Sequence, residues 1–305
     1  MAPGTSTSAK SSATAFDANA PEKSGYSLVF SDDFSDPSKI DIRNTGQPGY
    51  NWYMNNFYWS NPTPPDAISF GDDGITLSGL ISTATGTGRD KTALVGRGWS
   101  GGAYFEAQLQ FDPDKVFVED RHWPAFYGLS WQLASKTDQT PNQPNGYQHF
   151  AEIDFMEYGF WNHRNTTETS KHFWLRGGTK YTYFWQIMHD WYGIKGVTCA
   201  DTSWCGISNN AGSALMKIRD LRGWHRYGAR WVVGDATRKS FIQAYYDGAP
   251  IGPPVYWTAY DKLENVPVPP TDENPYSITD FTKFIIVFQA NEKAPVKVRQ
   301  VKVWQ

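Results

Sequence analysis

The strict alternation of apolar and polar side chains from Ala103 to Phe111 is the feature that most constrains the fold of this chain. Successive side chains of a β-strand point to opposite faces, so a period of two residues predicts a strand with one face in a core. The polar face is predicted to meet either solvent or the floor of a concave surface. The core face consists of Ala103, Phe105, Ala107, Leu109 and Phe111.

Other segments carry the same kind of signal. Asp72-Asp73-Gly74 and Asp247-Gly248 are turn sequences, and they predict β-hairpins within residues 68–79 and 241–251. The apolar run from Phe284 to Phe288 predicts a strand buried on both faces. The valines near the C-terminus change phase at Arg299-Gln300, which predicts a β-bulge there. Residues 210–221 are the one candidate for a short helix.

Short strands, frequent Gly turns and almost no helical pattern predict an all-β sandwich of two antiparallel sheets. The 305 residues are enough for one large domain, which we expect to span residues 26–305. Residues 1–25 are rich in Ser, Thr, Ala and Pro and predict a disordered tail. This tail lacks the apolar centre of a signal peptide.

A second strand segment, His149 to Gly159, contains three carboxylates within six residues. Alternation places Glu152 and Asp154 on one face and their apolar neighbours on the other. Simple alternation would send Glu157 to the apolar face. One extra residue, a β-bulge at Phe155-Met156, would return Glu157 to the acidic face, and bulges are frequent beside active sites.

Three acids on one strand face repel each other, and a purely structural strand gains nothing from that. Glycoside hydrolysis with retention of configuration does need paired carboxylates: one attacks the anomeric carbon and the other protonates the leaving oxygen. Mutual repulsion raises at least one pKa, which keeps an acid protonated near neutral pH. The alternatives are an acidic strand that faces solvent, or half of a calcium site.

The sequence Glu-Ile-Asp-Phe-Met-Glu also resembles the signature of glycoside hydrolase family 16, which includes laminarinases, lichenases, agarases and carrageenases. It matches the bulged form of that signature. The resemblance implies Glu152 as nucleophile, Glu157 as general acid and base, and Asp154 as the residue that tunes the nucleophile. It also implies a β-jelly roll of the concanavalin A type over residues 26–305.

The resemblance extends to residues that would contact substrate. In the alternating segment from Trp123 to Trp131, the side chains of Trp123, Tyr127 and Trp131 share a face. The segment resembles a Trp-Pro-Ala-Phe-Trp strand of the family, with Tyr127 in place of its second Trp. His172 has the spacing of a histidine that reaches the family's cleft, although a buried structural histidine is equally consistent. Arg97 lies in a loop that resembles an Arg-containing loop of the family.

These features predict an endo-acting, retaining hydrolase of a β-linked polysaccharide, with a β-1,3- or mixed-linkage β-1,3/1,4-glucan as substrate. A basic cluster favours an algal galactan such as agarose, porphyran or carrageenan, unless it is an ordinary solvated face. A glycan-binding lectin on the same fold is the alternative from another class. Met156 argues against a xyloglucan transglycosylase, which carries the unbulged signature. The basic cluster consists of Arg164, Lys171, Arg176 and Lys180.

Charge and cysteine usage set the remaining expectations. A net charge of −3 without a basic run argues against nucleic acid, and no apolar run approaches the roughly 20 residues of a membrane span. We expect a monomer whose partner is a polysaccharide. Cys199 and Cys205 predict a loop disulfide, which fits a secreted protein, whereas zinc would need two more ligands close by. Asn165-Thr166-Thr167 is a glycosylation sequon.

The expected chemistry needs no cofactor. The resemblance implies that a structural calcium ion can occur on the convex face, as it does in parts of the family. Nothing in the sequence identifies ligands for it.

Overall fold

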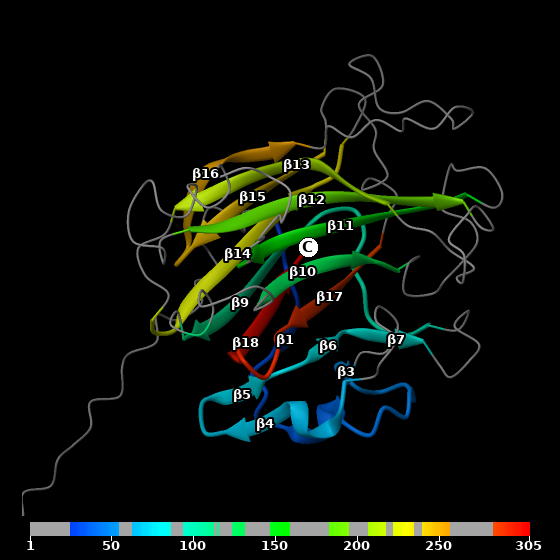
Figure 1. The fold of residues 1–305 in the computed structure, drawn as a ribbon, viewed down its shortest axis with the longest axis vertical. Helices are drawn as coiled ribbons and strands as arrows, with labels where there is room; N and C mark the ends of the chain where they lie inside the picture. The colour runs from blue at the N-terminus through cyan, green and yellow to red at the C-terminus, as the bar shows by residue number, and fades with distance from the viewer. Residues whose placement is uncertain are drawn as a thin grey trace, which may run out of the picture.

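The computed structural model describes residues 25–54, 63–86, 94–112, 115, 124–131, 147–158, 183–194, 207–217, 222–234, 240–256 and 283–305. Over these residues the chain forms two large β-sheets that face each other, so the predicted all-β sandwich of jelly-roll type is confirmed (Figure 1). We call the sheet that carries Glu152 the acidic sheet and the other the C-terminal sheet.

The acidic sheet has the order β13-β12-β11-β10-β17-β6-β3-β2. Figure 1 shows its long central strands side by side. Its described strands are antiparallel neighbours except for β2 and β3, which are parallel. The bounds are β2 (Ile40–Asp41), β3 (Trp52–Met54), β6 (Leu80–Ser82), β10 (Ala125–Ser130), β11 (Tyr147–Glu157), β12 (Tyr183–Ile194), β13 (Ile207–Lys217) and β17 (Phe284–Gln289).

The C-terminal sheet has the order β16-β15-β14-β9-β18-β5-β4, with β1 also paired to β18. Its bounds are β1 (Leu28–Asp32), β4 (Ile68–Gly71), β5 (Gly74–Leu77), β9 (Ala103–Phe111), β14 (His225–Val232), β15 (Phe241–Tyr246), β16 (Ala249–Tyr256) and β18 (Val296–Trp304). Two smaller strands, β7 (Ala84–Gly86) and β8 (Leu94–Gly96), form a separate ribbon. Single turns of 3-10 helix span Pro37–Lys39 and Pro65–Ala67.

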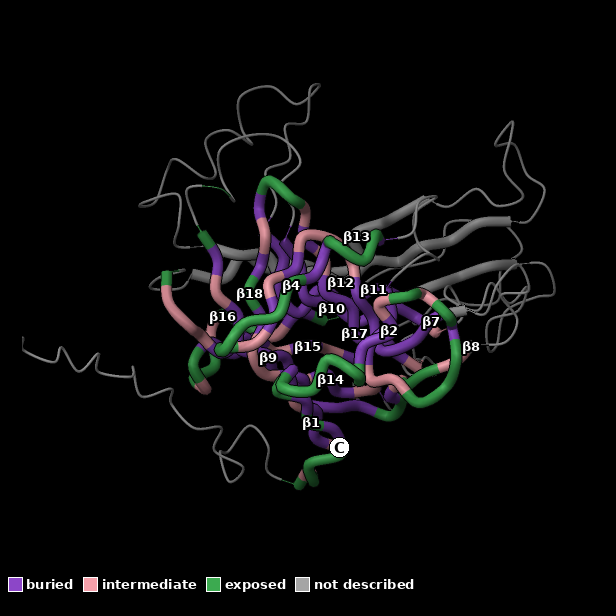
Figure 2. Tube along the Cα trace, turned by 90° about the horizontal axis from the view of Figure 1, so that it is seen from below, coloured by how far each residue is buried: buried purple, intermediate pink, exposed green. Residues whose placement is uncertain are grey.

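The main core lies between the two sheets, and Figure 2 shows the buried residues gathered along their strands. All five apolar residues predicted for the core face of β9 belong to it. The rings of Phe105 on β9 and Phe155 on β11 stack across the core with centroids 4.6 Å apart. Contacts of this kind hold the strand of acids against the opposite sheet.

The polar face of β9 is not uniform, because most of it is buried and only its last residue, Gln110, is partly exposed. Tyr104, Glu106 and Gln108 are buried there. The Tyr104 hydroxyl donates a hydrogen bond to a Glu106 carboxylate oxygen at 2.8 Å. Tyr104 also packs with Tyr245 and Trp304 in a second cluster outside the sandwich core. Aromatic rings therefore cover this face around Tyr104, whereas Gln110 at its other end stays partly exposed.

The predicted turns and the C-terminal bulge are confirmed. β4 and β5 form a hairpin around Asp72-Asp73, and β15 and β16 form one around Asp247-Gly248. Asp247 and Gly248 have φ of 52° and 83°, the positive values that a two-residue type I′ turn requires. The register of β18 on β9 shifts between Val298 and Gln300, so Arg299 is the extra residue.

The predicted helix over residues 210–221 is wrong. Residues up to Lys217 form β13, which pairs with β12 from Tyr192↔Ile207 to Tyr183↔Lys217. Three apolar residues at helical spacing suggested the helix, but pairing along a long neighbouring strand outweighs so weak a local pattern. Within the described ranges, no helix has the length and apolar character needed to cross a bilayer.

Candidate active site

The predicted bulge in β11 is present, and it brings the three acids to one face of the strand. The register to both neighbouring strands shifts between Asp154 and Glu157. Phe155 and Met156 consequently both lie in the core, where simple alternation would admit only one of them. Gly128 of β10 makes room for this arrangement, since a Cβ there would lie 3.1 Å from the Phe155 ring. The acids occupy the outer face of the acidic sheet.

The register fixes how far apart the acids lie. Glu152, Asp154 and Glu157 pair with Leu129, Tyr127 and Ala125 of β10, so the two glutamates are separated by four positions of that strand. At a rise of about 3.3 Å per residue, their Cα atoms are about 13 Å apart. Asp154 pairs midway between them, about 7 Å from each. Retaining glycosidases place their two carboxyl groups about 5–5.5 Å apart, so the glutamate side chains would have to lean toward each other along the strand to reach that separation.

The acids are almost entirely removed from solvent. Glu152, Asp154 and Glu157 are 7%, 1% and 9% exposed, and beside them lies a smaller apolar cluster that includes Tyr127 and Leu129. Burial raises the pKa of Asp154 from 3.8 to about 8, because a carboxylate loses its hydration there. At neutral pH the acidic face therefore holds a proton that exposed carboxyl groups would have lost.

Tyr127 is the register partner of Asp154 and is 1% exposed. Its hydroxyl donates a hydrogen bond to Gln289 Oε1 on β17 at 3.4 Å. Burial and the nearby charges of Glu152, Asp154 and Glu157 raise the pKa of Tyr127 well above its usual value, so it stays a neutral donor. The expectation that Tyr127 stacks on a sugar stays a prediction, and it requires the ring to become exposed.

Trp131 lies one position beyond β10 and packs, partly buried, against the same apolar cluster. The Lys283 ammonium lies 4.2 Å from the centroid of its ring, in a cation–π contact. Gly98 is pressed against Trp131, since a Cβ there would lie 3.1 Å from the ring. Arg97 directly precedes Gly98 in the chain, but its guanidinium lies over the ring of Phe30, 5.1 Å from the centroid.

Several predicted residues lie outside the described part of the chain. These are Trp123, His172, the basic cluster from Arg164 to Lys180, Cys199, Cys205 and Asn165. The strand that pairs with the far side of β11 is β12, which the sequence analysis did not predict. Its backbone places His189 opposite Glu152 and Trp185 opposite Glu157.

Gln289 is a further neighbour of the site that the sequence analysis missed. It pairs with Ala125, which in turn pairs with Glu157, so it lies two strands from that acid. The signal was present but weak: Gln289 is the first polar residue after an otherwise apolar strand. Among the residues that the structure describes, no group of three or more His, Cys, Asp or Glu could hold a metal ion.

No family model matches this chain, and no curated protein matches it. The solved structures that resemble it include an endo-1,3-β-glucanase from Streptomyces sioyaensis, at 16% identity and a TM-score of 0.45, covering 92% of this chain and 96% of that one. The VIP36 exoplasmic/lumenal domain in its Ca²⁺/Man3GlcNAc-bound form has 9% identity, a TM-score of 0.37 and coverages of 78% and 81%. An alginate lyase has 7% identity, a TM-score of 0.35 and coverages of 78% and 83%.

These similarities are too low to assign an activity, and the family 16 resemblance stays a prediction. The features of this chain that bear on its chemistry are the bulge in β11 and the burial of its three acids.

Proposed function

We propose that this chain is an endo-acting, retaining glycoside hydrolase that cleaves a β-1,3- or mixed-linkage β-1,3/1,4-glucan. One observation carries the proposal: a β-bulge places a third carboxylate on the same buried strand face as two others. A structural strand would gain nothing from burying three acids together, because each loses hydration and repels the others.

In the first step, the Glu152 carboxylate attacks the anomeric carbon and forms a glycosyl ester. The bond from that carbon to the bridging oxygen breaks, and its electron pair stays on the oxygen. Glu157, protonated at the start, gives its proton to this oxygen, so the leaving chain departs as a neutral alcohol.

In the second step, Glu157 acts as a base and removes a proton from a water molecule. The water oxygen attacks the anomeric carbon, and the ester bond to Glu152 breaks. Glu152 is again a carboxylate and Glu157 is again protonated, so the cycle closes without any other reactant. Two inversions at one carbon leave its configuration unchanged.

Asp154 lies between the two glutamates and carries a proton at neutral pH. A protonated carboxyl group can donate a hydrogen bond to the Glu152 carboxylate, which stabilises its charge before attack. The negative charge of Glu152 is lost when the ester forms, so this hydrogen bond weakens at that step. Asp154 is therefore assigned to tuning the nucleophile.

Reducing-end release from a polysaccharide panel tests the proposal. Laminarin, lichenan, curdlan, agarose, porphyran and carrageenans would be incubated with the wild-type chain and with Glu152→Gln. We expect cleavage of laminarin or lichenan that the variant reduces by more than a thousandfold while its melting curve stays cooperative. Variant activity within tenfold of wild type would remove Glu152 from the mechanism, and glycan binding without cleavage would favour a lectin.

A further inference from the structure

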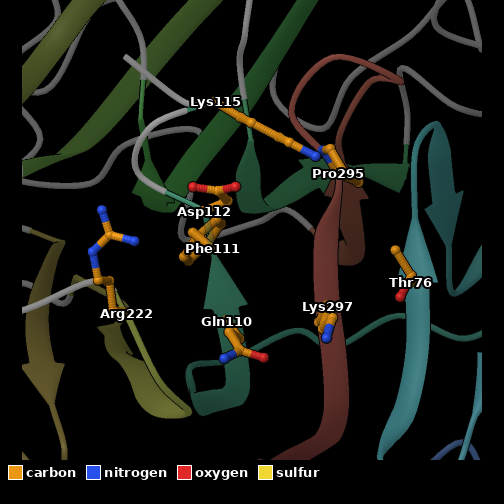
Figure 3. Close-up of a pocket in the computed structure, with 8 residues that line it drawn as sticks. All are labelled: Thr76, Gln110, Phe111, Asp112, Lys115, Arg222, Pro295 and Lys297. Carbon is orange, nitrogen blue, oxygen red and sulfur yellow. The ribbon is translucent and has the colours of Figure 1, made fainter. Parts of the chain in front are cut away.

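A pocket lies on the outer face of the C-terminal sheet, and Figure 3 shows the residues that line it. The three acids lie on the outer face of the acidic sheet, so the pocket and the acids are on opposite sides of the sandwich. The floor of the pocket is a row of Thr76, Lys297 and Gln110, which are register partners on β5, β18 and β9. Val296 and Val298 flank Lys297 and belong to the core, so the row faces away from it. The pocket has a volume of about 410 Å³.

The walls of this pocket concentrate positive charge. Lys115 follows β9, Arg222 precedes β14 and Lys297 lies on β18, so three cations from distant parts of the sequence meet around one space. All three side chains are exposed. Among the lining residues that the structure describes, Asp112 is the one carboxylate, so these residues carry a formal excess of two positive charges. The chain as a whole carries −3, so this excess is local.

This combination of groups suits an oxyanion carried on a sugar. Arg binds a carboxylate or sulfate through two parallel hydrogen bonds, and Lys supplies point charges. The Thr76 hydroxyl and the Gln110 amide are donors and acceptors of the kind that sugar hydroxyl groups pair with. The volume lies within the range of about 300–1,000 Å³ that is typical of ligand pockets.

The surroundings add an aromatic side chain. Trp224 lies two residues after Arg222 and is partly exposed. The Arg299 guanidinium lies 4.6 Å from its ring centroid and donates a hydrogen bond to Gln108 at 2.6 Å. Trp224 is not among the residues that line the pocket, and Arg299 lies over one face of its ring. A sugar that extends beyond the pocket could pack only against the ring's remaining surface.

We propose that this pocket is a second carbohydrate-binding site, which holds a uronate or sulfated sugar unit of a polysaccharide chain. It would anchor an acidic polymer to the face opposite the acids, and it does not depend on the hydrolysis proposed above.

The test is calorimetric titration of the full chain carrying Glu152→Gln, so that no probe is cleaved. The probes are tetragalacturonate, a sulfated carrageenan tetrasaccharide, neutral laminaritetraose and inorganic sulfate. We expect at least one of the two acidic tetrasaccharides to bind. The one that binds more tightly shows whether the pocket prefers a carboxylate or a sulfate ester. Adding Arg222→Gln and Lys297→Gln together should weaken binding about two- to thirtyfold, since exposed ion pairs contribute about 0.2–1 kcal/mol each.

Matched variants separate this site from general charge attraction. Lys293→Gln removes one exposed cation outside the pocket and should change affinity less than twofold. Asp112→Asn should strengthen binding. In the wild-type background, the pocket substitutions should leave the cleavage rate of neutral β-glucan unchanged, so failure of the hydrolase proposal is seen separately.

Three results would overturn the proposal. The first is that the pocket substitutions leave the affinity for both acidic tetrasaccharides unchanged. The second is that Lys293→Gln lowers affinity as much as they do. The third is that inorganic sulfate binds as tightly as the acidic tetrasaccharides, which would make the pocket an anion site without sugar recognition.

Discussion

Asp154→Asn should make the protein more stable at alkaline pH, although it removes a predicted active-site group. Asp154 has a pKa of about 8 in the folded protein, against an ordinary value of 3.8, because it is buried. Between these values the folded state holds a proton that the unfolded state has lost. Stability therefore falls as pH rises through this range, and it stops falling above about pH 8.

The size of the effect follows from the same pKa values. Each pH unit between the two pKa values lowers the free energy of unfolding by about 1.4 kcal/mol. The whole range therefore costs about 6 kcal/mol, and the part between pH 5 and 8 costs about 4 kcal/mol. A protein's total stability is about 5–15 kcal/mol, so this loss is large. For a domain of this size, 1 kcal/mol shifts the melting temperature by about 2–4 °C, so we expect a difference of about 10 °C.

The assay is thermal unfolding of wild type and Asp154→Asn at intervals from pH 5 to 9. Asparagine does not titrate, so the melting temperature of the variant should exceed that of wild type by a margin that grows as pH rises, while its turnover falls.

Asp247→Asn is the matched control with the opposite sign. Burial opposes ionisation of Asp247, but hydrogen bonds from His225 and the Arg226 N–H outweigh it and lower its pKa. That variant should lose stability at neutral pH, with the loss shrinking as pH falls through the folded pKa of Asp247. Melting temperatures of Asp154→Asn and wild type that change in parallel with pH would contradict the assignment of a bound proton to Asp154 at neutral pH.

Two further substitutions probe the bulge and the acid. Phe155→Ala should lower the free energy of unfolding in urea by about 3–5 kcal/mol, because the ring is 2% exposed and stacks across the core. Phe70→Ala is the control: this ring is 40% exposed, so its loss should cost less than about 0.5 kcal/mol. An equal cost for both would contradict the core position of the bulge. Glu157→Gln should slow polysaccharide cleavage about 10²–10⁴-fold but leave ester formation from a dinitrophenyl glycoside nearly unchanged, since that leaving group needs no proton. Equal losses on both substrates, measured by burst kinetics, would remove Glu157 as the acid.

Both bulges could be predicted from the sequence because each breaks a clear alternation. In each case the side-chain alternation along the strand shifts by one residue, at Glu157 and among the C-terminal valines. A β-bulge of one extra residue restores the alternation. The hairpin at Asp247-Gly248 was predictable for a similar reason, since few sequences adopt two successive positive φ values.

Other features depend on contacts between distant segments, which local patterns do not contain. The pairing of β13 with β12 overrode a weak helical spacing. The polar face of β9 was expected to meet solvent or to floor a concave surface, but Tyr104 and its aromatic neighbours bury part of it. The sequence did not indicate the burial of Tyr127 beside the acids, which keeps its hydroxyl neutral and in reach of Gln289. The basic pocket unites Lys115, Arg222 and Lys297, whose proximity no sequence spacing indicates.

The configuration of the first sugar released tests the central claim most directly. Proton NMR would follow the polysaccharide that the panel shows to be cleaved fastest, before mutarotation mixes the anomers. Double displacement through Glu152 predicts that the β-anomer appears first and the α-anomer only later. Initial appearance of the α-anomer would show a single displacement by water, and it would contradict the assignment of Glu152 as a nucleophile.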